Sequence, residues 1–71
     1  MKKKLSFYEF TQLSDEEQYD LLFREGEFLD SSTKKEVEFI LYRLFSFFVE
    51  VIYFWESNMI LNLNSFMKDK N

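Results

Sequence analysis

The feature that most constrains the fold is the segment over residues 37–55, in which fifteen of nineteen residues are apolar or aromatic. Glu38, Arg43 and Glu50 interrupt it, and each charge near the centre of a bilayer costs about 2.5–3.5 kcal/mol on insertion scales. These charges argue against a membrane helix. Because Val, Ile, Tyr, Phe and Trp dominate the segment and favour strands, it predicts two long strands, followed by a third over about residues 59–66.

Two capping-box patterns indicate that the first third of the chain is helical. Ser6 and Ser14 are each followed three residues later by a glutamate, Glu9 and Glu17. In this arrangement the hydroxyl and the carboxylate satisfy free amides at a helix start. The patterns predict a short helical turn and then a longer helix that ends just before Gly26. This only glycine stands where a helix C-terminus favours a left-handed residue.

The longer helix is expected to pack on the sheet through one apolar stripe. Tyr19, Leu22 and Phe23 have the i, i+3, i+4 spacing of such a stripe. After this helix the pattern changes to that of strands. Residues 27–30 are expected to form a short strand, and residues 31–33, Ser-Ser-Thr, a loop.

The hairpin turns set the register of the predicted sheet. Residues 56–58, Glu-Ser-Asn, favour a three-residue loop because Asn tolerates the left-handed region, and this loop pairs Val51 with Leu63. A similar loop over residues 43–45 pairs Leu41 with Phe47, although Phe is a poor residue for its left-handed position. A register slip of one residue would reverse the side chains of a strand.

In this register one sheet face is almost wholly apolar and is expected to lie under the helices. The opposite face of such a sheet is usually polar. Here it carries seven large apolar side chains: Ile40, Tyr42, Phe48, Ile52, Phe54, Ile60 and Phe66.

This apolar surplus is the main functional signal in the sequence. At about 1.5–3 kcal/mol per side chain, leaving seven of them in water forgoes roughly 10–20 kcal/mol of burial, comparable to the whole stability of a small domain. A second copy, a different partner or the N-terminal segment is expected to cover them. The candidate interface residues are Ile40, Tyr42, Phe48, Ile52, Phe54 and Ile60.

The composition excludes much of the chemistry that enzymes use. The chain has no Cys and no His, which removes disulfides, thiolate metal sites and imidazole acid–base catalysis. The predicted register places Glu38 opposite Glu50, and a carboxylate pair of this kind can retain a proton and act as an acid. A small register error, or a cation between the two groups, is the alternative explanation.

Three other clusters give no specific chemical signal. The acidic residues within 15–20 lie on one exposed helix and do not converge on a metal ion. A hydroxyl of residues 31–33 and the amine of Lys34 or Lys35 could act as a nucleophile and a base. The preference of Ser and Thr for turns explains this Ser-Ser-Thr segment without any such chemistry. The aromatic residues of 45–55 have acidic neighbours, which favours core packing over nucleic-acid stacking. We expect no catalytic, cofactor or metal site.

Charge is unevenly distributed along the chain. Three lysines open the sequence, residues 5–30 carry one Arg and eight acidic residues, and the formal net charge is −4. This balance argues against a nucleic-acid partner. Residues 1–5 are expected to form a basic tail, because Glu9 and polar residues after it interrupt any signal-peptide core. The absence of Cys fits a reducing, cytoplasmic setting.

Two stretches together resemble a known type of protein. They are Tyr-Glu-Phe-Thr-Gln-Leu-Ser-Asp-Glu-Glu-Gln-Tyr over residues 8–19, running on to Gly26, and Phe-Phe-Val-Glu-Val-Ile-Tyr over residues 47–53, running into the turn at 56–58. The arrangement resembles short uncharacterised proteins of Bacteroides-type bacteria that have a helical segment followed by a β-meander. The resemblance covers most of the chain and implies this fold and a cytoplasmic bacterial setting. It implies no activity and no site residues.

We therefore expect a single α+β domain over residues 1–71. Helical segments over residues 6–26 should pack on a three- or four-stranded antiparallel β-meander over residues 27–67. The functional prediction is a non-catalytic interaction module, without cofactors, that forms a homodimer or binds another protein through its free sheet face. Three alternatives stay open: an acidic inhibitor or immunity-type protein that binds a basic partner, a binder of apolar ligands between helix and sheet, and a small enzyme.

Overall fold

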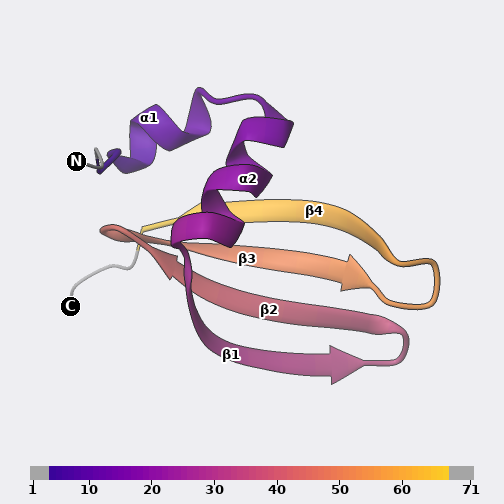
Figure 1. The fold of residues 1–71 in the computed structure, drawn as a ribbon. Coiled ribbons are helices and arrows are strands. Elements are labelled where there is room, and N and C mark those ends of the chain that lie inside the picture. Colours follow the sequence, from indigo (N-terminus) through magenta and orange to yellow (C-terminus); the bar gives the residue numbers. More distant parts are fainter. Residues whose placement is uncertain (1–3, 68–71) are drawn as a thin grey trace.

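The structure is a computed structural model that describes residues 4–67. Two N-terminal helices are followed by a four-stranded antiparallel sheet with the strand order β1-β2-β3-β4 (Figure 1). The predicted α+β class and β-meander are confirmed. The predicted basic tail lies mostly outside the described residues. The elements are α1 (Phe7–Thr11), α2 (Asp15–Glu25), β1 (Glu27–Lys34), β2 (Val37–Leu44), β3 (Phe47–Phe54) and β4 (Met59–Phe66).

Both predicted capping boxes are present. The Ser6 amide donates to Glu9 Oε1 at 2.9 Å, and the Glu9 amide donates back to Ser6 Oγ at 3.1 Å. Ser14 and Glu17 repeat the exchange at 3.1 and 3.2 Å. Each box satisfies amides that a helix N-terminus leaves without partners, so two short helices can start eight residues apart.

Gly26 ends α2, but not by the predicted left-handed conformation. Its φ of −73° and ψ of 148° are extended, a backbone that any residue can adopt. A Cβ at this position would lie 2.5 Å from the carbonyl oxygen of Leu22 and 2.9 Å from Leu22 Cδ1. Glycine is needed here because the chain passes close to the last turn of α2 on its way into β1.

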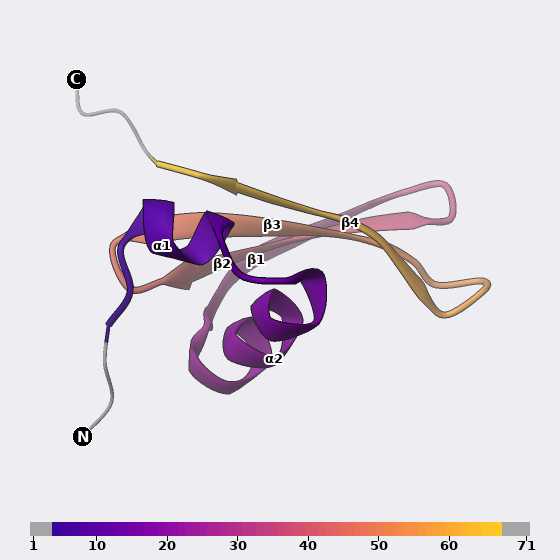
Figure 2. The same cartoon turned by 90° about the horizontal axis from the view of Figure 1, so that it is seen from above.

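Both helices pack on the same face of the sheet (Figure 2). Phe10 and Leu22 from the helices are fully buried with Leu44, Phe47 and Val49 from the sheet. The rings of Phe10 and Phe47 lie 5.2 Å apart, and Gln18 Nε2 donates to the Phe10 carbonyl at 2.9 Å, which ties α2 to α1. Of the predicted helix stripe, Leu22 is in the core, whereas Phe23 is 56% exposed.

The β2–β3 hairpin corrects the predicted register. Its loop has two residues, Phe45 and Ser46, and Leu44 pairs with Phe47. The predicted three-residue loop paired Leu41 with Phe47, three positions away from the observed pairing. An odd shift exchanges the faces of one strand relative to its neighbour. Phe45 does adopt a left-handed φ of 58°, but as the first residue of the shorter loop.

The other two hairpins also differ in part from expectation. Val51 pairs with Leu63 as predicted, and Asn58 has a left-handed φ of 59°. Nearer the turn, a β-bulge at Leu61 shifts the pairing, so that Tyr53 lies opposite Ile60. Residues 31–33 are part of β1 rather than a loop, and the turn follows at Lys35 and Glu36.

No helix within residues 4–67 has the length and apolar composition that a membrane span requires. The longer of the two, α2, has 11 residues and an acidic first turn. Helices of about 20 apolar residues are needed to cross the hydrocarbon core.

Candidate functional site

The candidate site is the sheet face that points away from α1 and α2, called the open face below. Side chains alternate between the faces of a strand, and Phe47, Val49 and Val51 point to the helices. The intervening residues of β3 therefore point to the open face, and the strand pairing assigns their neighbours. Four cross-strand rows result: Glu27, Arg43, Phe48 and Phe66; Asp30, Leu41, Glu50 and Asn64; Ser32, Phe39, Ile52 and Asn62; and Lys34, Val37, Phe54 and Met59.

Half of these sixteen row positions are apolar, and six of the eight apolar residues lie on the central strands β2 and β3. The six are half-buried by their neighbours in the sheet, and none belongs to the core under the helices. The rings of Phe48 and Phe66 stack with centroids 5.7 Å apart. The open face thus carries an apolar strip along its two central strands, which Arg43 and Glu50 interrupt, and the other polar residues of the face lie on the edge strands.

The structure divides the six predicted interface residues between the two faces. Phe48, Ile52 and Phe54 of β3 lie on the open face. Ile40, Tyr42 and Ile60 pack against the core on the helix side, so their predicted place on the free face is wrong. The cause is the shorter β2–β3 loop and the β4 bulge. Sequence reasoning missed the residues that take their place: Val37, Phe39, Leu41 and Met59.

The charged residues of the open face differ in their pairing. Arg43 Nη2 donates to Glu27 Oε1 at 2.6 Å, an ion pair between neighbouring strands. Asp30 accepts a hydrogen bond from the Ser31 amide at 2.8 Å. Within residues 4–67, Lys34 and Glu50 make no ion pair and no side-chain hydrogen bond. Glu50 is the only acidic residue of the open face on a central strand, between Leu41 and Asn64.

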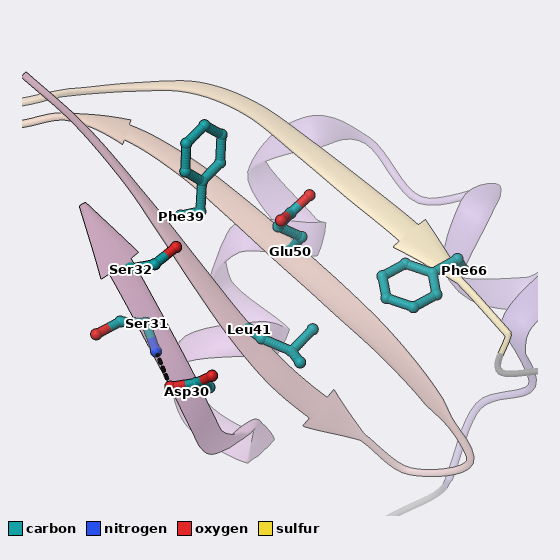
Figure 3. A pocket seen from close by; sticks show the side chains of 7 residues that line it. All are labelled: Asp30, Ser31, Ser32, Phe39, Leu41, Glu50 and Phe66. Atoms are coloured by element: carbon teal, nitrogen blue, oxygen red, sulfur yellow. Dashed lines mark hydrogen bonds between the residues drawn. The ribbon is translucent and has the colours of Figure 1, made fainter. Parts of the chain in front are cut away.

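Two open hollows lie on this face. One, of about 250 Å³, is lined by Asp30, Ser31, Ser32, Phe39, Leu41, Glu50 and Phe66 (Figure 3). The other, of about 310 Å³, is lined by Leu29, Leu41, Phe48 and Phe66. Both hollows lie on the open face. The alternative function of binding apolar ligands predicted a pocket between the helices and the sheet, which is a different place. Their volumes are at or below the lower end of those of small-molecule sites.

The proposed carboxylate pair does not exist. Glu38 lies opposite Tyr53 and shares the helix-side face with Ile40, whereas Glu50 lies opposite Leu41 on the open face. The two groups point to opposite sides of the sheet and cannot share a proton. The predicted hydroxyl–amine loop is also absent, because residues 31–33 are strand residues whose side chains alternate between faces.

No group of three or more acidic residues in the described part of the chain is arranged to hold a metal ion. The acidic residues at the start of α2 lie along its first turn, where the helix dipole favours negative charge. Their position is explained by helix stability.

The two edges of the sheet are both protected against strand pairing. On β1, Glu27, Asp30 and Lys34 carry charges, and the pairing is irregular around Leu29. On β4 a bulge interrupts the strand, and α1 lies alongside its C-terminal part (Figure 1). Charges, bulges and covering helices are the usual means of preventing edge-to-edge association. Within residues 4–67, no helix or loop covers the open face in a comparable way.

Comparison of the chain with protein-family models, with curated proteins and with solved structures finds no match. The resemblance to helix-plus-meander proteins of Bacteroides-type bacteria stays a prediction. Function is therefore inferred from the open face itself.

Proposed function

We propose that this chain is a non-catalytic interaction module that self-associates through its open face. The supporting observation is the apolar strip along β2 and β3 on the side that neither helix covers. The largest apolar patch on the surface of a soluble protein is often a functional contact site. A cytoplasmic setting is part of the proposal and is supported by the absence of Cys from the sequence.

The size of the face supports a stable contact between two copies. Each strand has eight residues, so at about 3.3 Å per residue and about 4.8 Å between strands the face covers about 500 Å². Two such faces bury about 1,000 Å² in total, the size at which specific interfaces begin. Stacked sheets about 10 Å apart with interdigitating side chains are the established packing mode for such faces.

Phe48 is the residue expected to contribute most to association. It lies on a central strand, stacks on Phe66 and borders one of the two hollows. Aromatic residues in the interior of an interface carry much of the binding energy, because they bury a large apolar area at low entropic cost.

The test compares two equivalent substitutions by sedimentation velocity. Phe48→Asp places a charge in the open face and should convert the dimer into a monomer of 8.8 kDa. Phe23→Asp places the same charge on α2, at a side chain that is 56% exposed, and should leave the dimer intact. Circular dichroism confirms that both variants fold. Equal dissociation of both variants, or of neither, would contradict the assignment of the interface to the open face.

A further inference from the structure

We infer that the two copies stack about a two-fold axis that lies between the sheets and runs across the strands. This inference rests on the proposed self-association through the open face. A two-fold interface brings the same surface of both copies together. For two sheets packed in the aligned mode, the in-plane axis runs either across the strands or along them. The charges of the open face distinguish these two arrangements.

An axis across the strands places each row of one copy over the row at the opposite end of the other. The row that starts with Glu27 then lies over the row that starts with Lys34 in the second copy. Glu27 meets a lysine of opposite charge, Phe48 meets Phe54, and Phe66 meets Met59. In the two inner rows Leu41 meets Phe39. All four rows overlap, so the whole apolar strip is covered in both copies.

An axis along the strands produces mismatched contacts. It places β1 over β4 and β2 over β3 of the second copy. Lys34 then lies over Met59, Arg43 over Phe48 and Leu41 over Glu50. Arg43 and Glu50 face apolar side chains of the second copy in both arrangements, so they do not distinguish the two axes. Lys34 meets an opposite charge only with the axis across the strands, and covering it without one is costly. The first arrangement is therefore favoured.

Lys34 has a distinct part in the favoured arrangement. Lys34 makes no ion pair within residues 4–67. Glu27 already forms an ion pair within its own chain, in which its Oε1 lies 2.6 Å from Arg43 Nη2. Lys34 of the second copy adds a second cation to this carboxylate, and two-fold symmetry repeats the contact. Lys34→Glu should weaken dimerisation about tenfold, since two rim contacts turn from attractive to repulsive. Lys4→Glu, an equal charge change at an exposed residue outside the open face, should leave the dimer affinity unchanged.

The decisive experiment measures the distance between spin labels on the two copies. The chain has no Cys, so Ser57→Cys in the exposed β3–β4 turn provides a single labelling site. From strand dimensions and a sheet separation of about 10 Å, the axis across the strands separates the two turns by about 35 Å, and the axis along the strands by about 14 Å.

The outcomes separate this inference from the proposed function. A distance near the longer value in a sample with the mass of a dimer supports the axis across the strands. The shorter distance in a dimer overturns that axis but leaves self-association through the open face standing. A labelled protein with the mass of a monomer and no dipolar coupling, together with a monomeric unlabelled chain, overturns the proposed function as well.

Discussion

Phe47 and Phe48 are neighbours in β3, yet their rings point to opposite faces of the sheet. Phe47 is fully buried, 5.2 Å from Phe10 and 5.6 Å from Phe7. Phe48 points to the open face and stacks on Phe66. The same residue type thus has a structural role at one position and the proposed interface role at the next.

This relationship predicts different effects for two alanine substitutions. Phe47→Ala should lower the free energy of unfolding by about 3–5 kcal/mol, because it leaves a cavity in the core. Phe48→Ala should cost the monomer clearly less, since that ring is only half-buried. Urea unfolding at low protein concentration, where the monomer dominates, measures both. Equal losses would contradict the assignment of the two rings to core and open face.

Gly26→Ala should destabilise the fold by steric overlap. A Cβ there would lie 2.5 Å from the Leu22 carbonyl oxygen, and overpacking of this kind costs about 1–3 kcal/mol. The φ of −73° itself would suit alanine, so the cost measures the close approach alone. A thermal melting temperature equal to that of the wild type would show that the chain at this point has room for a methyl group.

Ser14→Ala should remove the capping box of α2. The loss of the hydrogen bond from the Glu17 amide to Ser14 Oγ is expected to cost about 1 kcal/mol. Ser57→Ala is the matched control, because its side chain is exposed in a turn and makes no hydrogen bond within the described residues. Chemical unfolding of both variants tests the difference, and similar stabilities would argue against the cap.

Glu50→Gln should strengthen self-association. In the proposed dimer the carboxylate is covered opposite Ile52 of the second copy without a cation, and burying an unpaired charge is costly. The neutral amide should tighten the dimer about tenfold. Glu36→Gln, in the exposed β1–β2 turn, provides the same charge change as a control. Dissociation constants from dilution experiments compare them, and weaker binding by Glu50→Gln would mean that the carboxylate meets a cation.

Local signals in the sequence predicted the starts of both helices and part of the β3–β4 hairpin correctly. The two Ser–Glu spacings found both helix starts, and Asn58 marked a left-handed turn residue that the structure confirms. These features depend on a few adjacent residues, whose hydrogen bonding and backbone preferences decide the conformation without reference to the rest of the chain.

The face assignment could not be read from the apolar pattern of β2. Ile40 and Tyr42 alternate with Phe39 and Leu41, so both faces of the strand are apolar and either register is compatible with a hydrophobic core. The turn should then decide, but Phe45 lacks the Asn-Gly or Asp-Gly chemistry that identifies two-residue loops. The sequence predicts a loop over polar residues 31–33 because an edge strand whose side chains are exposed on both faces shows no apolar alternation.

Light scattering on the wild-type chain tests the central claim most directly. If the open face self-associates, the mass at tens of micromolar should be about twice 8.8 kDa, and it should fall toward the monomer value on dilution. A constant mass of 8.8 kDa over this range would contradict self-association, and the apolar strip of β2 and β3 would then need a different partner.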